Sequence, residues 1–220
     1  GSITADSYNG SVSFIQTQPG VLLDAAYNTQ VSFKGNVTTG GAAPIRFGTG
    51  GGMAIFNGTT AQALNGNASY PPLVTKMEMN NSAGLTLNVP VTADYLSLIN
   101  GAVYTSAPNL LTFPDNGVAA GSSAASFIVG TVKKIGNDAF TFPVGKGTSY
   151  QRIAISAPAL TTDAFTAEYF NSGQTFGSVL DTGLGAISSC EYWQLDRTAG
   201  TSNVFVTLGW NQYSCNIPSD

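Results

Sequence analysis

Short segments in which apolar and polar residues alternate recur along the whole chain. A period of two puts one apolar face against a core and predicts β-strands. No segment combines apolar residues at helical spacing with start and stop signals. The clearest predicted strands cover residues 31–33, 45–47, 53–55, 85–87, 96–98 and 204–208. Asn-Gly pairs, which favour tight turns, lie between many of the segments. We therefore expect an all-β protein with at most one helical turn.

The first part of the chain is quasi-repetitive. Apolar segments that begin at Met77, Leu85, Leu96 and Leu110 follow one another, and two steps span 19 to 25 residues, a period that averages in the low twenties. That period lies in the range of one coil of a solenoid, although a Greek-key sandwich shows turn signals at similar spacing. We expect a parallel β-solenoid with an N-terminal cap over residues 1–135, with two β-sandwich domains as the alternative.

The character of the chain changes after Gly136. The apolar segments become longer and more aromatic, and the turns between them lengthen. This pattern is typical of antiparallel sheets that each bury one face. We expect a β-sandwich over residues 136–220, incomplete at its C-terminus. Trp193 and Trp210 alternate in phase with apolar neighbours and are expected in its core.

Composition restricts the chemistry. Charged residues make up 9% of the chain, the net charge is −4, and there is no His. The absence of His excludes Ser-His-Asp and Cys-His catalysis and His-bound zinc. No basic stripe suits nucleic acid, and no apolar run approaches the roughly 20 residues of a membrane span. We expect no enzyme activity, no cofactor, no metal site, no nucleic-acid partner and no membrane insertion.

Cysteine usage and overall composition bear on location. Cys190 and Cys215 are the two thiols. In an oxidising compartment they would form one disulfide, and in a reducing one they would be two buried thiols. Few Lys and Glu residues, and many Asn, Thr, Ser and Gly residues, favour the first alternative and a secreted or cell-surface location.

Several runs resemble a family of large secreted or cell-surface proteins of Bacteroidota. The residues that resemble its solenoid repeats are NNSAGLTLNVPVT at 80–92 and LSLING at 96–101. Those that resemble its following segment are FIVGTVKKIGNDAFTFPVGK at 127–146, EYWQLDRT at 191–198 and VFVTL at 204–208. The resemblance implies an adhesin-like protein, often exported by the type IX route, and it brings no catalytic residues.

Candidate binding residues are few. Tyr192, Tyr213 and Tyr169 are the tyrosines expected to contact a ligand, because sugar-binding modules stack sugar rings on exposed aromatic side chains. Thr side chains fall in no regular ladder. Lys133 and Lys134 are expected on a solvated sheet edge, where charge discourages edge-to-edge pairing.

Two pairs of acids could serve a lyase or glycosidase, which needs acid and base groups about 5–10 Å apart. The pairs are Glu78 with Asp94 and Glu168 with Glu191; we expect all four to point to solvent instead. The sequence thus favours a non-enzymatic structural or adhesive module for extension, adhesion or fibre assembly. A carbohydrate-binding module is the alternative, and a polysaccharide lyase or glycosidase comes third. The expected partner is a surface polysaccharide or another protomer.

Overall fold

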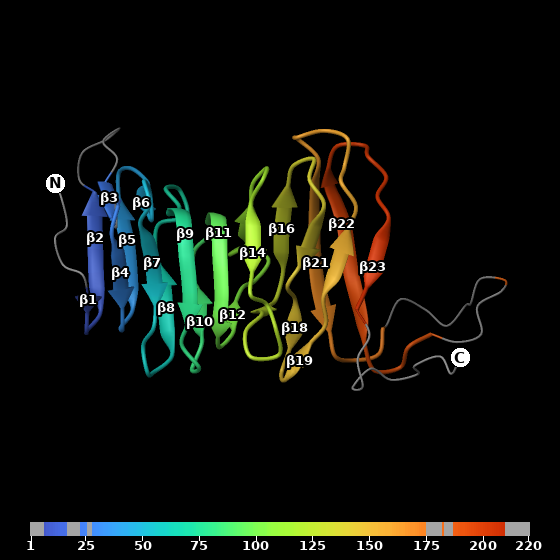
Figure 1. Cartoon of the computed structure of the whole chain (residues 1–220), viewed down its shortest axis with the longest axis horizontal. Helices are drawn as coiled ribbons and strands as arrows, with labels where there is room; N and C mark the ends of the chain where they lie inside the picture. Colours follow the sequence, from blue (N-terminus) through green and yellow to red (C-terminus); the bar gives the residue numbers. More distant parts are fainter. Residues whose placement is uncertain (1–6, 17–22, 26–27, 175–181, 183–186, 210–220) are drawn as a thin grey trace.

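The computed structural model describes residues 7–16, 23–25, 28–174, 182 and 187–209. These residues form strands, turns and loops without any helix, and hence without a helix that could cross a membrane. Most of the strands wind into a parallel solenoid along the long axis of the molecule, and antiparallel sheets follow it (Figure 1). The expected fold class is therefore confirmed.

Each circuit of the solenoid visits three faces in turn. Face 1 is a six-stranded parallel sheet, whereas faces 2 and 3 are two halves of one twelve-stranded sheet. Face 1 contains β2 (Val12–Gln16), β5 (Val37–Gly41), β8 (Gln62–Asn65), β10 (Leu85–Leu87), β12 (Val103–Tyr104) and β15 (Ile128–Val129). Face 2 contains β3 (Leu23–Ala25), β6 (Ile45–Phe47), β13 (Leu111–Phe113) and β16 (Val132–Ile135). Face 3 contains β1 (Ser7–Tyr8), β4 (Gln30–Phe33), β7 (Met53–Phe56) and β14 (Val118–Ala120).

Two long strands cross the bend between faces 2 and 3. They are β9 (Leu73–Asn80) and β11 (Val91–Asn100), which pair with each other over nearly their full length. At the bend, two successive residues of each strand point outward, Thr75 with Lys76 and Asp94 with Tyr95. In the preceding coil the corresponding corner is the loop that contains residues 48–52. Gly48 is required there, because its φ is +72° and a Cβ would lie 2.5 Å from the carbonyl oxygen of Lys76.

The interior of the solenoid is a narrow apolar core. Phe14, Phe33 and Phe47, one from each face, pack edge to face with ring centroids 5.5–6.0 Å apart. Further along the axis the core consists of Met, Leu and Val side chains from successive coils. Alternation of buried and exposed positions within each strand supplies these side chains, as the period-two pattern predicts.

Polar ladders hold the corners of the coils together. The amide nitrogen of Asn88 donates to the Asn65 side chain at 2.8 Å, 23 residues earlier, and Asn65 donates to Thr38 at 3.5 Å, 27 residues earlier. Inside another corner, the buried side chains of Gln62 and Asn81 share a 2.9 Å hydrogen bond. These bonds link consecutive coils at their corners, whereas apolar side chains fill the space between the faces.

The antiparallel region continues the solenoid directly. β21 (Ala164–Phe170) and β22 (Tyr192–Ala199) extend face 2 beyond β16. A second sheet contains β17 (Phe140–Phe142), β20 (Ile153–Ile155) and β23 (Val206–Leu208). A hairpin of β18 (Gly145–Lys146) and β19 (Ser149–Tyr150) completes the region. Inward side chains of the two larger sheets belong to the same buried cluster as the solenoid core. Trp193 packs against that cluster, as expected, and Trp210 lies outside the described residues.

Lys134 corrects the prediction of a solvated edge at Lys133 and Lys134. Its strand, β16, is an inner strand, paired with β13 on one side and β21 on the other. The Lys134 side chain is 1% exposed, lies 2.9 Å from the Asp138 carboxylate and donates to the carbonyl of Pro114 at 2.7 Å. Lys133 points outward from the same strand.

Candidate functional site

A row of outward-facing side chains crosses the strands of face 2. Each member is the ladder partner of the next, so the row is in register from strand to strand. The members, which we call the face-2 row, are Arg46, Leu73, Thr92, Thr112, Lys133, Thr166 and Asp196. Both chain neighbours of each of the first six members are buried, so these side chains point to solvent. With strands about 4.8 Å apart, the row is about 29 Å long.

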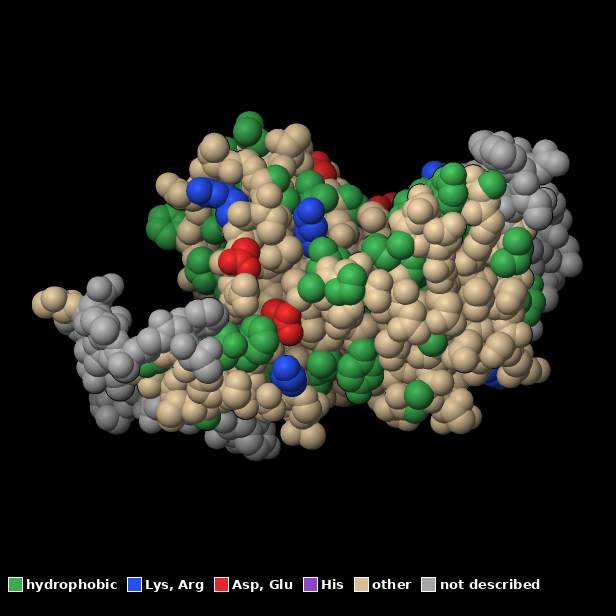
Figure 2. Space-filling view, turned by 180° about the vertical axis from the view of Figure 1, so that it is seen from behind, with side chains coloured by type: hydrophobic (Ala, Val, Ile, Leu, Met, Phe, Trp, Pro, Cys, Tyr) green, Lys and Arg blue, Asp and Glu red, His purple; other side chains and the backbone are tan. Residues whose placement is uncertain are grey.

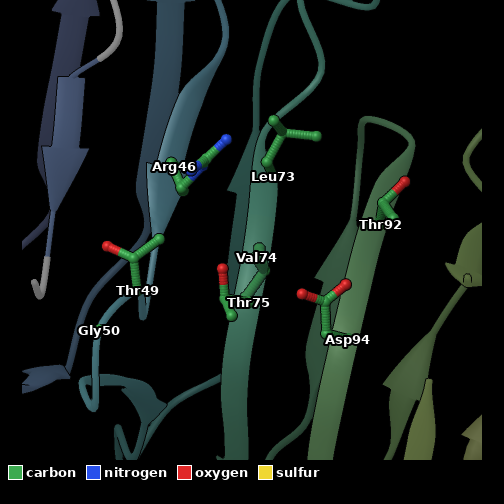
Figure 3. A pocket seen from close by; sticks show the side chains of 8 residues that line it. All are labelled: Arg46, Thr49, Gly50, Leu73, Val74, Thr75, Thr92 and Asp94. Carbon is green, nitrogen blue, oxygen red and sulfur yellow. The ribbon is translucent and has the colours of Figure 1, made fainter. Parts of the chain in front are cut away.

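A groove with a volume of 470 Å³ lies at the start of the row. Three adjacent strands, β6, β9 and β11, line it together with the loop after β6 (Figure 3). Leu73 supplies apolar surface, and Thr75 and Thr92 supply hydroxyl groups. The lining residues are Arg46, Thr49, Gly50, Leu73, Val74, Thr75, Thr92 and Asp94. The groove thus offers both apolar contact and hydrogen-bonding groups, as small-ligand sites do.

The groove contains one positive and one negative side chain. Arg46 is on β6 and reaches toward Leu73, whereas Asp94 is on β11 beside Thr75 (Figure 3). Two strand spacings and two residues along the strand separate them, or about 12 Å between Cα atoms. Within the described residues the one ion pair joins Lys134 to Asp138. Arg46 and Asp94 therefore both face the groove with their charges available to a ligand.

A second hollow, of 290 Å³, lies at the far end of the row. It is lined by Ala107, Thr131, Thr166, Ala167, Glu168, Gln194 and Asp196. The Thr131 hydroxyl donates to Glu168 at 2.5 Å, and the Gln194 amide donates to Asp196 at 2.7 Å. These hydrogen bonds fix the carboxylates in place at the surface. Lys, Arg, Asp and Glu side chains elsewhere are few, and on the face seen in Figure 2 they stand singly among uncharged groups.

Of the predicted ligand contacts, Tyr192 shares the outward side of β21 and β22 with the second hollow. Its ring stacks on Phe170 with centroids 4.5 Å apart and planes 6° apart, and Lys146 Nζ lies 5.2 Å from the Phe170 centroid. Tyr169 is a correction: it is 3% exposed and points into the core, because its neighbours in β21 point outward. Tyr213 lies outside the described residues.

The predicted acid pairs are not brought together. Asp94 lies beside Thr75, and Glu78 lies three residues further along β9, past the bend, so the Cα atoms of the two acids are about 11 Å apart on neighbouring strands. Both point outward, as expected. Glu168 also points outward, but Glu191 is 1% exposed, which corrects the prediction that it faces solvent.

Glu191 lies immediately before β22, and its side chain points to the same side of the sheet as Trp193, toward Tyr169 and Gln151. Its Oε2 accepts hydrogen bonds from the Tyr169 hydroxyl at 2.8 Å and the Gln151 amide at 3.1 Å. Glu168 and Glu191 thus lie on opposite sides of the sheet and cannot act on one substrate bond.

Two other expectations concern bonds and metals. Cys190 is half-buried, and Cys215 lies outside the described residues, so their disulfide stays a prediction. In the described part of the chain, no three His, Cys, Asp or Glu side chains gather where they could hold a metal ion.

The alignment of the face-2 row could not be read from the sequence. Thr92 and Thr112 are ladder partners, but the coils differ in length, and corner bonds span 23, 25 or 27 residues. A search at one fixed period therefore could not align them. The usable signal was each residue's position between two apolar residues of a short strand.

Comparison of the chain with protein-family models, curated proteins and solved structures gives no match. The resemblance to surface proteins of Bacteroidota therefore stays a prediction.

Proposed function

We propose that this chain is a non-enzymatic structural and adhesive module of a secreted or cell-surface protein, and that its face-2 row binds a surface polysaccharide. The in-register row is the observation that supports this function. A polymer with regularly repeated hydroxyl groups can bond to successive strands of such a row. A small ligand would use only one or two of them.

The chemistry of the row suits an uncharged or weakly charged sugar chain. Thr92 and Thr112 can each donate and accept a hydrogen bond. Arg46 and Asp94 flank the groove at one end, and the stacked rings of Phe170 and Tyr192 lie on the same side at the other. Hydrogen-bonding groups therefore lie along the row and a flat aromatic surface lies at one end, which suits the hydroxyl edges and C–H faces of sugars.

The solenoid itself suits a spacer. Each coil contacts mainly its neighbours, through ladders that run along the axis. Side-chain bonds between coils at the corners add to these ladders. The row is thereby carried on a support of stacked coils.

Binding to a broad glycan array tests the proposal, with heat-unfolded protein as the blank. The Thr92→Val, Thr112→Val double variant keeps β-branched side chains in the strands but removes two hydroxyls. Two lost hydrogen bonds of about 1 kcal/mol each should weaken binding by about thirtyfold. Thr86→Val on face 1, also exposed in the middle of a three-residue strand, is the matched control. This function would be rejected if no glycan on the array bound the protein. It would also be rejected if the Thr92→Val, Thr112→Val double variant bound as tightly as the Thr86→Val control.

Polysaccharide cleavage is the second candidate, since a carboxylate and a guanidinium share one groove. Incubating the bound polysaccharide with the protein and measuring its chain length separates the two functions. Cleavage that is lost in Asp94→Asn would establish the enzyme; constant chain length would leave the adhesive function.

A further inference from the structure

The antiparallel region contains an apolar pocket that the face-2 row does not use. Its volume is 460 Å³, and it opens between β22 and β23, each the last strand of its sheet within the described residues. Trp193 and Leu195 form one wall, and Val206 and Leu208 form the other. Ile153, the ladder partner of Leu208, lies between them.

A buried carboxylate also lines this pocket. Glu191 is 1% exposed, and both donors to its Oε2, the Tyr169 hydroxyl and the Gln151 amide, are uncharged. Its Oε1 is buried and has no hydrogen-bond partner. A buried acceptor without a donor is costly, and a buried carboxylate normally has a cationic partner.

The surroundings of Glu191 do not supply that partner. Tyr169 stays a neutral donor, because burial and the neighbouring Glu191 carboxylate raise the pKa of its hydroxyl. Within the described residues no Lys or Arg side chain pairs with Glu191. A cation that complements this carboxylate would therefore have to come from outside the chain, and Glu191 lines the pocket.

We infer that this pocket binds a primary alkylammonium group, with the ammonium on Oε1 of Glu191 and its aliphatic chain between Trp193 and Val206. An ammonium carries three N–H donors and a positive charge, so it satisfies both the hydrogen-bonding need and the charge of the site. Trp193 adds an aromatic face of the kind that attracts cations. The same chemistry occurs in free alkylamines and in the lysine side chain of a peptide.

Titration with n-pentylammonium, followed by the NMR signal of the Trp193 indole N–H, tests this site. The signal should shift and saturate with pentylammonium, and 1-pentanol should bind at least tenfold more weakly. Glu191→Gln should weaken pentylammonium binding at least tenfold. A capped Gly-Lys-Gly peptide, compared with the same peptide containing norleucine, shows whether the pocket accepts the amine on a peptide as well as free.

A second variant guards against a folding defect in Glu191→Gln. Val206 is 48% exposed on β23, so Val206→Trp should fill the pocket, abolish binding and leave the unfolding midpoint unchanged. Equal affinity for pentylammonium and pentanol, saturation that Val206→Trp leaves unchanged, or no shift at all would overturn the inference. Glycan binding by the face-2 row does not depend on any of these outcomes.

Discussion

Replacing Gln62 by Met should strongly destabilise the solenoid, because this one side chain joins three coils. Its amide nitrogen donates to the carbonyls of Phe33 at 2.8 Å and Gly35 at 2.7 Å, in the preceding coil. Its oxygen accepts from the backbone N–H of Gly58 at 3.0 Å and from Asn81, in the next coil, at 2.9 Å. Gln62 is 2% exposed, so water does not reach these groups.

The size of the effect follows from which groups lose their partner. The Phe33 carbonyl still accepts from the N–H of Asn57, and the Asn81 amide still donates to the Thr60 carbonyl. The Gly58 N–H and the Gly35 carbonyl lose the hydrogen bonds that Gln62 makes to them. At about 1–3 kcal/mol for each buried unsatisfied group, Gln62→Met should lower the free energy of unfolding by about 4 kcal/mol. Met has nearly the same length as Gln, so little of the loss should come from a cavity.

Urea denaturation followed by circular dichroism measures this loss. Asn88→Leu is the matched control, since its 2.8 Å bond to Asn65 is exposed and water can replace the lost amide. The control should change the free energy of unfolding by less than about 0.5 kcal/mol. A Gln62→Met protein within about 1 kcal/mol of the wild type would refute the reasoning, because burial would then not make these bonds costly to lose.

Three further predictions concern backbone and charge. Gly101 has φ +84°, and a Cβ there would lie 1.8 Å from the carbonyl oxygen of Asn81, whereas nothing lies within 4 Å of a Cβ on Gly10. Gly101→Ala should therefore cost about 1–3 kcal/mol or more in thermal unfolding, and Gly10→Ala almost nothing; equal midpoints would contradict this. Lys134→Met should lower the free energy of unfolding by about 1–2 kcal/mol. Adding Asp138→Asn should recover part of the loss, because no unpaired carboxylate then remains. Purely additive effects in the double variant would argue against the ion pair. Burial favours the protonated form of Asp138, but hydrogen bonds from Lys134 and the Asn116 N–H, with the Lys134 charge, hold its pKa below the ordinary 3.8. A group with a lowered pKa stabilises the fold above about pH 4, and this stabilisation is lost as the pH falls through the pKa of the folded state. The difference in free energy of unfolding between the wild type and Asp138→Asn should therefore shrink in acid. A difference independent of pH would contradict the lowered pKa of Asp138.

The individual strands could be predicted because the signal for each is local. In β6 and β10, for example, a polar residue lies between two apolar ones, and the structure buries the apolar pair and turns the polar residue outward. Tyr169 and Lys134 show where this reasoning failed. Each has both polar and apolar neighbours in the sequence, so the pattern does not say whether its side chain points into the core or to solvent. That could be known only once the pairing partners of β21 and β16 were known.

The sequence by itself determined the all-β class, the positions of several strands and the lack of histidine chemistry. Only the tertiary structure decided which residues of different coils lie side by side: the face-2 row, the groove between Arg46 and Asp94, and the buried carboxylate of Glu191. The physical reason is that strand formation depends on neighbouring residues, whereas the register of the solenoid depends on pairing between residues 18 to 27 positions apart. Coils of unequal length leave no fixed period from which that register could be read.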